Sequence, residues 1–563
     1  MPRRTSCALR VFAACLAVFC FGASPTAHAQ RISVQADDYQ QAFEGVGSSI
    51  PLYLNNHFNG TDSLGRRQAL DLIVRRNNLL CLQDYPEFRL DDPRAQNGYY
   101  ARRVEYLRAA KAIRPELLLS QTFSIFPDDL RKDTTVDGKN ERRLDFRRAG
   151  IYDEVAQWYF ETLKFYNDNG LPIDVVNLVN EPDFIVWRYG YDRDARRGTA
   201  ELFTQGVDKL RALIDGANAA GDSIPQPRIM GPSTIGPGGA VGFLNYYKDE
   251  YPAAWDNIDI VSYHQYTNGV GSALQTVTRL AEGKPVWQSE MHTNRGDNLG
   301  NLPLTRGHRG ILSLAQLMTE SLNAGANAWF YFLNVFPGED TNPGLLQIDN
   351  TVARPVPFRH YYAFRQIGSA QPAGARVVTR RLASIRSDGD VLALREEGSD
   401  TVYVHYANYT GGERVVELEI VDAGGGAYPI RSYAQRVSDA DSDDEDLGFR
   451  DAERADAVTV TAGPYSLNTF TVAIGGTSGL SPKPAPAPFR AYADGDAVTV
   501  QLDEGFEPEA VRLADVSGRV LRQAHLAVGQ RTARLPAGGL APGVYLVSAR
   551  TARGWATVRV LWQ

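Results

Sequence analysis

The sequence predicts an α/β barrel joined to all-β regions. Short apolar runs alternate with longer amphipathic stretches between residues 43 and 365. Eight such runs occur, which is the number of strands that a closed parallel barrel requires. After residue 365 the pattern changes to short stretches of alternating apolar and polar residues, typical of β-sandwiches. The predicted fold class is therefore α/β, a (β/α)8 barrel with a side β-sandwich and a separate C-terminal all-β domain.

The candidate strands and helices of the barrel alternate along the chain. Strands are expected at 43–49, 78–84, 116–123, 174–180, 227–233, 259–266, 284–290 and 328–334. Helices are expected at 66–76, 102–113, 151–170, 201–221 and 310–326. About 40 residues for each βα unit is generous, but a barrel with long loops allows it. A doubly wound open sheet is the alternative, and it is disfavoured because no Gly-rich phosphate-binding loop follows the first strand.

The first 29 residues are typical of a secretory signal peptide. A basic start is followed by an apolar core at 11–21, too short to span a bilayer, and by the small residues around Ala29. Three of the four cysteines lie in this segment, so the mature chain keeps only Cys81 and has no intrachain disulfide. Cys81 is expected to be an inert packing residue. We expect the protein to be secreted or held at the cell surface, with no membrane span.

Charge and length exclude some classes of protein. The formal charge is −7, and removal of three signal-peptide arginines brings the mature chain near −7 − 3 = −10. This charge argues against nucleic acid or an anionic membrane as a partner. More than 500 residues are too many for one hydrophobic core, so two or three domains are expected.

The ends of the expected strands carry the candidate chemistry, because parallel barrels place their active sites at the carboxyl ends of strands. The fourth strand ends in Asn180 and Glu181, the sixth runs through His264 to Tyr266, and the seventh ends in Glu290. Glu181 and Glu290 are separated by three βα units of about 36 residues each. Both carboxyl groups are therefore expected at the same rim of the barrel.

Two carboxyl groups across a sugar-sized cleft are what acetal hydrolysis requires. One donates a proton to the leaving oxygen, and the other attacks the anomeric carbon and forms a covalent intermediate. A separation of about 5–5.5 Å is typical of this retaining mechanism, and an inverting pair stands farther apart. Taken alone, Asn180 and Glu181 fit the start of a helix equally well, and Glu290 fits a solvated loop. The pair at matched strand ends is more specific than either member.

Other side chains near these strand ends are candidate contacts for a sugar. Trp187 and the two tyrosines that follow it are candidates for a stacking platform, with core packing of a loop as the alternative. Trp329 and Phe332 are candidates for the floor of the first sugar subsite. His264 is either a substrate contact or a wall residue bonded to a backbone carbonyl.

Three motifs resemble a known group of enzymes. The stretches LVNEPDF (178–184), SYHQY (262–266) and VWQSEMH (286–292) resemble the retaining glycoside hydrolases of clan A. The segment 355–378, which leads into a β-rich tail ending in YSLNTFTVAI, is more narrowly similar to glycoside hydrolase family 30. The resemblance covers about 31–474 and implies a TIM barrel fused to a side β-sandwich that also takes up the N-terminal strand.

The resemblance implies roles for individual residues. Glu181 matches the acid/base of the family and Glu290 the nucleophile. Asn180 matches the residue that hydrogen-bonds the sugar 2-hydroxyl, and Tyr266 matches the residue that orients the nucleophile. Phe123 stands where many members have Trp, so it keeps an apolar wall but lacks the indole donor.

Two C-terminal features raise further possibilities. The acidic run at 438–451 suggests calcium, but its spacing does not match an EF-hand loop, so a solvated loop is favoured. Residues 489–563 resemble the sorting domain of the type IX secretion system, which implies secretion machinery as a partner. The final VLWQ lacks the usual lysines, and an ordinary accessory β-sandwich is the alternative.

The chain therefore divides into six expected segments. They are 1–29 (signal peptide), 30–42 (N-terminal strand of the side sandwich), 43–365 (catalytic barrel), 366–474 (side β-sandwich), 475–488 (Gly/Ser/Pro linker) and 489–563 (sorting-like β-domain).

We predict a secreted retaining glycoside hydrolase that cleaves β-glycosidic bonds of a polysaccharide, with an endo-β-xylanase-type activity. Alternatives on the same fold are β-1,6-glucanase, β-1,6-galactanase and exo-acting β-glycosidase activities, and a further alternative is a non-catalytic carbohydrate-binding protein. A metal-dependent hydrolase that uses His264, His292 and the two glutamates is disfavoured, because no H-x-H spacing of metal ligands occurs. We expect no cofactor, no metal and a monomer.

Overall fold

The computed structural model describes residues 30–562 with internal gaps. The expected signal peptide and most of the expected linker lie outside the described residues. The gaps are 51–53, 55–61, 97, 137–138, 147, 184–194, 268–269, 293–308, 337–343, 349–353, 370–375, 383–388, 440, 476–488, 504–507, 509, 515–519, 528, 542 and 552–553.

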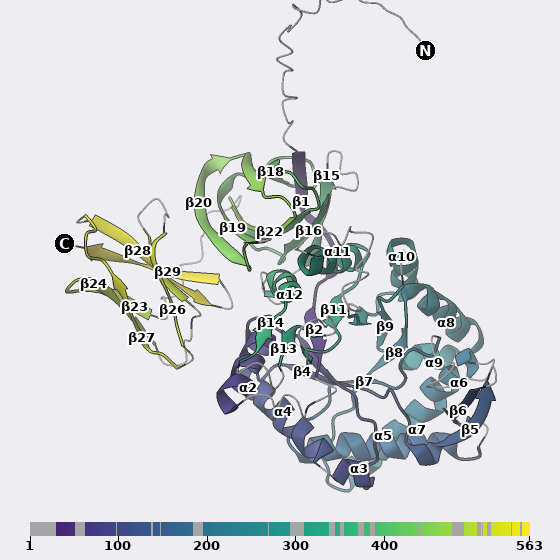
Figure 1. The fold of residues 1–563 in the computed structure, drawn as a ribbon. Helices are drawn as coiled ribbons and strands as arrows, with labels where there is room; N and C mark the ends of the chain where they lie inside the picture. The colour runs from purple at the N-terminus through teal and green to yellow at the C-terminus, as the bar shows by residue number, and fades with distance from the viewer. Residues whose placement is uncertain are drawn as a thin grey trace, which may run out of the picture.

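Eight parallel strands close into a barrel, which confirms the predicted fold class (Figure 1). In chain order they are β2 (Gly45–Ser49), β3 (Cys81–Asp84), β4 (Leu118–Thr122), β7 (Val175–Asn177), β8 (Arg228–Thr234), β9 (Ile260–His264), β10 (Val286–Glu290) and β11 (Ala328–Tyr331). Each overlaps one of the eight expected strands. The barrel closes where β11 pairs with β2, with Ala328 opposite Gly45.

Side chains fill the interior of the barrel. Cys81, Trp287 and Phe330 belong to one buried cluster there, and Cys81 is a fully buried free thiol, as expected. Burial raises the pKa of Cys81 to about 12, which keeps the thiol protonated and unreactive. The Phe330 ring lies so close to β2 that a Cβ on Gly47 would approach it within 2.3 Å. A glycine is therefore required at this point of the wall.

Helices surround the barrel and bury its outer face. They are α2 (Ser63–Leu70) with the π-turn η1 (Asp71–Arg75), α3 (Pro93–Gln96), α4 (Tyr99–Ile113), α5 (Ile151–Asp168), α6 (Ala195–Glu201) with η3 (Leu202–Gly206), α7 (Val207–Ala219), α8 (Pro237–Glu250), α9 (Pro252–Asn257), α10 (Val270–Leu280), α11 (Arg309–Asn323) and α12 (Arg359–Ser369). Their inner faces form one large apolar cluster with the outward side chains of the strands. Because strand side chains alternate, both faces of each barrel strand are buried.

Short elements extend the loops between strands and helices. They are the turn η2 (Asp128–Leu130), the hairpin β5 (Arg131–Val136) and β6 (Lys139–Leu144), and a small sheet of β12 (Val335–Phe336), β13 (Leu346–Gln347) and β14 (Val356–Pro357).

A nine-stranded sheet forms the side sandwich next to the barrel, and the N-terminal strand lies within it. β1 pairs in parallel with β18 and antiparallel with β15, so the first described strand completes a sheet built from the middle of the chain. The strands are β1 (Gln30–Ala42), β15 (Arg376–Leu382), β16 (Gly389–Arg395), β17 (Thr401–Asn408), β18 (Arg414–Val421), β19 (Ile430–Ser438), β20 (Glu445–Ala455), β21 (Ala457–Ala462) and β22 (Ser466–Ile474).

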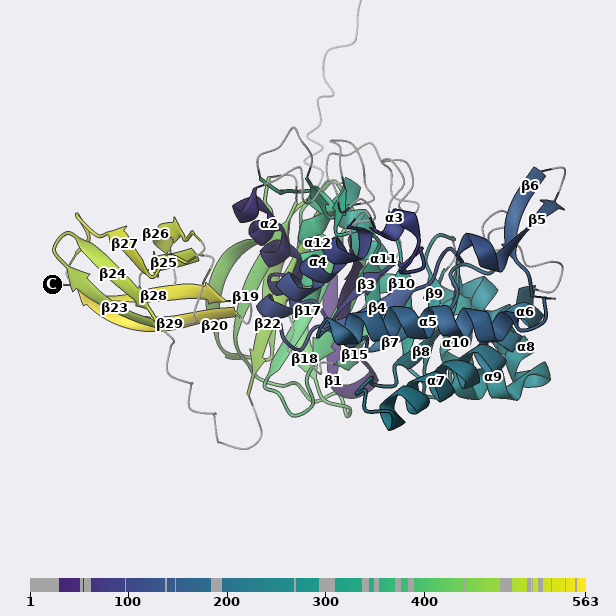
Figure 2. The same cartoon turned by 90° about the horizontal axis from the view of Figure 1, so that it is seen from below.

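The C-terminal domain consists of two small antiparallel sheets with their own apolar cluster. Figure 2 shows this domain on the side of the sandwich away from the barrel. One sheet contains β23 (Phe489–Asp494), β24 (Ala497–Leu502) and β27 (Thr532–Pro536), and the other β25 (Ala510–Ala514), β26 (Val520–His525), β28 (Gly543–Thr551) and β29 (Gly554–Trp562).

The acidic run of the sandwich contacts arginines. Asp444 lies 3.3 Å from the Arg550 guanidinium of the C-terminal domain, and Asp446 lies 3.6 Å from that of Arg512. Asp443 is paired with Arg359 of α12 at 2.7 Å. These carboxylates therefore bind arginines, partly across the boundary between two domains.

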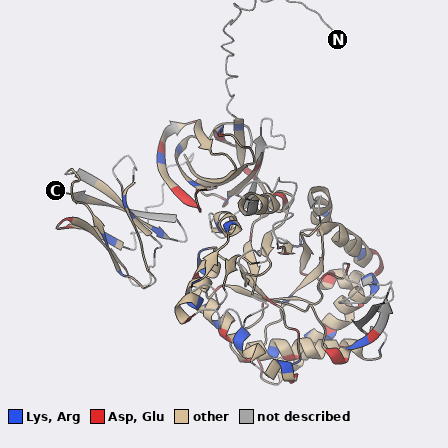
Figure 3. Ribbon diagram, in the orientation of Figure 1, with Lys and Arg blue, Asp and Glu red and all other residues tan. Residues whose placement is uncertain are grey.

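Charged side chains of both signs are interspersed over the outer helices (Figure 3). No helix in the described part of the chain is long and apolar enough to cross a membrane.

Candidate active site

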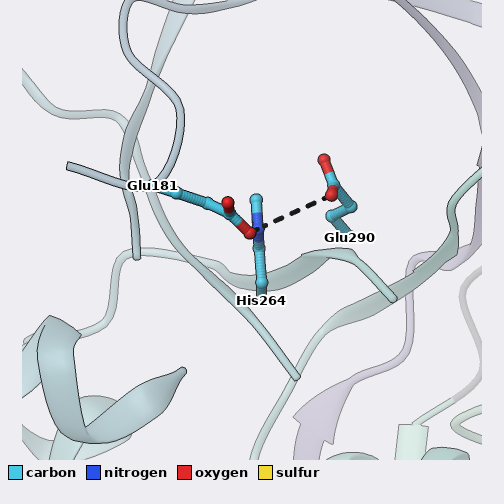
Figure 4. A group of neighbouring side chains, drawn as sticks. All are labelled: Glu181, His264 and Glu290. Atoms are coloured by element: carbon cyan, nitrogen blue, oxygen red, sulfur yellow. Dashed lines mark hydrogen bonds and ion pairs between the residues drawn. The ribbon is translucent and has the colours of Figure 1, made fainter. Parts of the chain in front are cut away.

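Three titratable side chains meet at the carboxyl ends of the barrel strands (Figure 4). His264 is the last residue of β9, Glu290 is the last residue of β10, and Glu181 follows β7. The His264 Nδ1 atom lies 2.9 Å from an Oε1 oxygen of Glu181 and 3.9 Å from Oε1 of Glu290. One carboxylate oxygen of each glutamate and this nitrogen all lie within 4.8 Å of one another. The two glutamates predicted from matched strand ends are thus brought together.

The three side chains are almost completely buried, with exposed fractions of 7% for Glu181, 6% for Glu290 and 0% for His264. Burial disfavours the charged carboxylate and raises the pKa of Glu290, although the neighbouring His264 opposes the rise. Burial alone would lower the pKa of His264. The carboxylates of Glu290 and Glu181 outweigh burial, so the pKa of His264 is raised. His264 and Glu290 therefore retain protons more readily than the same groups in water.

Two tyrosine hydroxyls hold the Glu290 carboxylate. The Tyr266 hydroxyl donates to Oε1 at 2.9 Å, and the Tyr85 hydroxyl donates to Oε2 at 2.7 Å. The sequence singled out Tyr266 and missed Tyr85. The signal was present, because Gln83, Asp84 and Tyr85 end an apolar strand with polar side chains, as the strands before Glu181 and Glu290 do.

The backbone at Glu181 is unusual. Its φ angle is +46°, in the left-handed region that side chains with a Cβ rarely adopt. Its N–H donates to the carbonyl oxygen of Ser233 at 2.9 Å, which anchors the strained residue to β8. The chain does not enter a helix between Glu181 and Asp183, so the helix-start alternative does not describe this turn. Strain of about 1–3 kcal/mol at such a position is typical of functional sites.

Other predicted site residues lie near this cluster. Asn180 is 6% exposed, and its Oδ1 makes no hydrogen bond to any described residue. The Phe332 ring lies beside the site, with its centroid 5.6 Å from that of Tyr85 and 5.5 Å from that of His292. Trp187 lies outside the described residues.

Two predicted contacts are wrong. Phe123 is fully buried, and its ring packs on Trp158 and Tyr159 of α5, with centroids at 4.7 and 4.3 Å. Trp329 is also fully buried, and its indole N–H donates to Gln265 at 2.9 Å. Both rings belong to the apolar layer between strands and helices, and neither is exposed to bind a sugar.

The donor set Glu181, His264 and Glu290 is also compact enough to hold a metal ion. Its donor atoms, however, are engaged by other groups. Both oxygens of Glu290 accept tyrosine hydroxyls, and His264 Nδ1 is bonded to Glu181. A metal ion at this position would therefore compete with these hydrogen bonds.

Comparisons with known proteins were made by sequence and by structure. No family model matches the chain. No curated protein matches it either.

Solved structures, in contrast, share the fold. A GH30 endoxylanase from Clostridium papyrosolvens C71 superposes with a TM-score of 0.60 at 16% identity, over 79% of this chain and 100% of that one. The catalytic domain of GH30 xylanase C from Talaromyces cellulolyticus gives 0.60 at 14% identity, over 79% and 100%. At such identities the likeness shows the fold, a barrel with an attached β-region as in these glycoside hydrolases.

A third structure matches more of the chain. It is the bacterial orthologue of human α-L-iduronidase, with a TM-score of 0.54 at 14% identity, over 94% of this chain and 99% of that one. Residues 30–488 make up a smaller share of the chain than this, so the match extends into the C-terminal domain.

Proposed function

We propose that this protein is a retaining glycoside hydrolase that cleaves β-glycosidic bonds of a polysaccharide. The observation that carries the proposal is the close approach of Glu181 and Glu290, whose nearest donor oxygens lie within 4.8 Å. Retaining enzymes place their carboxyl groups about 5–5.5 Å apart, whereas inverting enzymes need about 6.5–9.5 Å to admit a water molecule. The close approach of the two carboxyl groups supports the retaining arrangement.

The geometry supports distinct roles for the two glutamates. Glu290, held by Tyr266 and Tyr85, attacks the anomeric carbon and forms a glycosyl ester, while Glu181 donates a proton to the departing oxygen. Glu181 then takes a proton from water, which attacks the same carbon, and the electron pair of the ester bond returns to Glu290. His264 is bonded to Glu181; burial tends to lower the pKa of His264, but the neighbouring carboxylates outweigh burial and the pKa is raised.

Two further side chains are proposed to contact the sugar. Asn180 adjoins the acid, and its side-chain oxygen has no partner among the described residues, so it is available for a sugar hydroxyl. Phe332, between Tyr85 and His292, offers an aromatic surface at the rim.

The test of the mechanism uses Glu290→Gln and a covalent trap. This variant should lose at least about a thousandfold in kcat, because the nucleophile is gone. The matched control is Glu320→Gln, which alters a carboxyl group whose pKa is also raised by burial but whose side-chain partner among the described residues is Gln316 in α11. A 2-deoxy-2-fluoro glycoside should label Glu290 in the wild type, as seen by peptide mass spectrometry. Inversion of the product anomer, observed by NMR, would exclude the proposal.

The proposed substrate is xylan or a related β-linked polysaccharide cut within the chain. The support is the fold shared with the two GH30 xylanases and the matched motifs at β7, β9 and β10. An endo-β1,6-glucanase also shares the fold, with a TM-score of 0.55 at 15% identity, so β-1,6-glucan belongs in the screen. Xylan, β-1,6-glucan, β-1,6-galactan and aryl glycosides separate these activities, and addition of a chelator tests the metal-dependent alternative.

We also propose that the protein acts outside the cell as a monomer. The basic and apolar segment at 1–29 supports export, and residues 489–563 support delivery by a type IX secretion system. The intact mass of the exported protein would show whether both segments are removed. Retention of residues 489–563 would favour the accessory-domain alternative.

A further inference from the structure

Tyr85 occupies the rim of the barrel directly after β3, and several contacts fix its position. Its N–H donates to the Asp84 carboxylate at 2.8 Å, and its carbonyl oxygen accepts the Tyr99 hydroxyl at 3.0 Å. Its ring meets the edge of Phe332, and its exposed fraction is 3%. The hydroxyl is thus held in one place by the folded chain rather than by substrate.

An ionised Glu290 carboxylate can only accept, so the hydrogen bond between it and the Tyr85 hydroxyl is donated by Tyr85. Gln83 Nε2 donates to the Tyr85 oxygen at 2.7 Å and to Thr122 Oγ1 at 2.7 Å, which uses both amide protons. The Tyr85 proton is therefore left for Glu290 Oε2 at 2.7 Å. Burial raises the pKa of Tyr85 well above its ordinary value, and the Glu290 carboxylate adds to the rise, so the hydroxyl stays a donor.

The surroundings of Glu290 make this donor important. Among the described residues, Glu290 makes an ion pair with His264 at 3.9 Å. Each carboxylate oxygen of Glu290 also accepts one tyrosine hydroxyl. The carboxylate charge is thus balanced by His264 together with two neutral donors, Tyr85 and Tyr266. A hydrogen bond from a neutral donor strengthens as negative charge develops on its acceptor.

We propose that Tyr85 acts directly on the nucleophile in the second half of the reaction, by stabilising the Glu290 carboxylate as it leaves the sugar. The inference deepens the proposed function and rests on it. In that step water attacks the anomeric carbon and gives a proton to Glu181, and the bond between that carbon and the Glu290 oxygen breaks. The electron pair returns to Glu290, whose Oε2 then faces the Tyr85 proton. Tyr85 therefore stabilises Glu290 most in this hydrolysis step, in which the carboxylate regains its negative charge.

The decisive experiment compares kcat with KM in Tyr85→Phe. The substrate is the 2,4-dinitrophenyl β-xylobioside, β-glucoside or β-galactoside that the wild type hydrolyses fastest, because so good a leaving group makes hydrolysis of the intermediate rate-limiting. Loss of one hydrogen bond to a charged group should lower kcat by about tenfold to a hundredfold. KM should fall by a similar factor, so that kcat/KM changes little. Mass spectrometry under turnover should show a larger fraction of glycosyl-enzyme.

The matched control is Tyr106→Phe, which removes another buried tyrosyl hydroxyl, one that accepts from Asn334 at 2.9 Å. It should leave kcat, KM and the fraction of glycosyl-enzyme unchanged. Wild-type kinetics in Tyr85→Phe, or equal losses in kcat and kcat/KM with no accumulated intermediate, would overturn the role of Tyr85 while the proposed function stands. Absence of turnover by the wild type on every glycoside would instead overturn the proposed function.

Discussion

Two buried groups of charges in this protein are built in opposite ways. The proposed catalytic cluster at the barrel rim contains two carboxylates and His264, and two tyrosine hydroxyls bind one of the carboxylates, Glu290. The Asp444 cluster in the side sandwich contains one carboxylate, 1% exposed, that binds Arg436, Arg365 and Arg550. The first pairs its negative charges with one histidine and neutral hydroxyls, and the second surrounds its charge with guanidinium groups. We therefore expect changes in the first to affect the proposed activity and changes in the second to affect stability.

The histidines beside the two clusters have pKa values shifted in opposite directions. In the barrel, burial tends to lower the pKa of His264, but the neighbouring carboxylates have the larger combined effect and the pKa is raised. In the sandwich, burial and Arg436 lower the pKa of His405 to about 3. Stability gained from protonated His264 is present at low pH and lost as pH rises through its folded pKa. Stability that depends on neutral His405 is present at pH values above the pKa of this histidine in the unfolded chain, about 6.5, and is lost as the pH falls below that pKa.

The largest expected effect comes from removing the acid of the catalytic cluster. Glu181→Ala should lower kcat on the polysaccharide by about a hundredfold to ten-thousandfold, because the leaving oxygen needs a proton. Activity on a 2,4-dinitrophenyl glycoside should fall much less, since that leaving group departs as an anion. Steady-state rates on both substrates provide the comparison. Equal losses on the two would show that Glu181 is not the acid.

Breaking the Asp444 cluster should affect stability instead. Asp444→Asn keeps the shape of the side chain and leaves three arginines facing a neutral amide, which should cost about 3–5 kcal/mol of unfolding free energy. Activity per folded molecule should be unchanged at 25 °C. Calorimetry measures the loss, with the exposed Asp441→Asn as control. A loss below about 1 kcal/mol would mean that the cluster contributes little to the fold.

A smaller effect should appear with pH. Between pH 6.5 and 5 the unfolded chain protonates His405 and the folded chain does not, which should remove about 2 kcal/mol of stability. His405→Gln should abolish this part of the pH dependence, whereas His525→Gln, at an exposed site, should retain it. Urea unfolding at both pH values measures the difference. An unchanged dependence in His405→Gln would mean that His405 is protonated in the folded protein.

The smallest effect concerns the boundary between domains. Arg550→Ala should destabilise the C-terminal domain by about 1 kcal/mol, because Asp444 keeps its bonds to Arg436 and Arg365. Hydrogen exchange in β28 and β29 would detect this change. The control is Arg522→Ala, since the exposed Arg522 side chain bonds the backbone oxygen of Leu521 and no carboxylate of the described residues. Equal exchange in both variants would mean that the pair with Asp444 does not hold the domain.

The sequence predicted the barrel because its signals are local and repeated. Eight apolar runs mark eight strands, and matched strand ends place Glu181 and Glu290 at one rim. The direction of individual aromatic rings was not predictable. Both faces of a parallel barrel strand are buried, so hydrophobicity does not distinguish Trp329, which faces the helices, from Phe330, which faces the interior. Tyr85 was missed because its role depends on Glu290, 205 residues away.

The left-handed backbone at Glu181 has a consequence for protein engineering. Glycine or asparagine suits a φ of +46° better than glutamate does, so a search for stabilising substitutions would favour replacing this residue. The most stable variant at position 181 would then be an inactive one. Thermostabilised libraries of this protein should therefore be selected for turnover and heat resistance together.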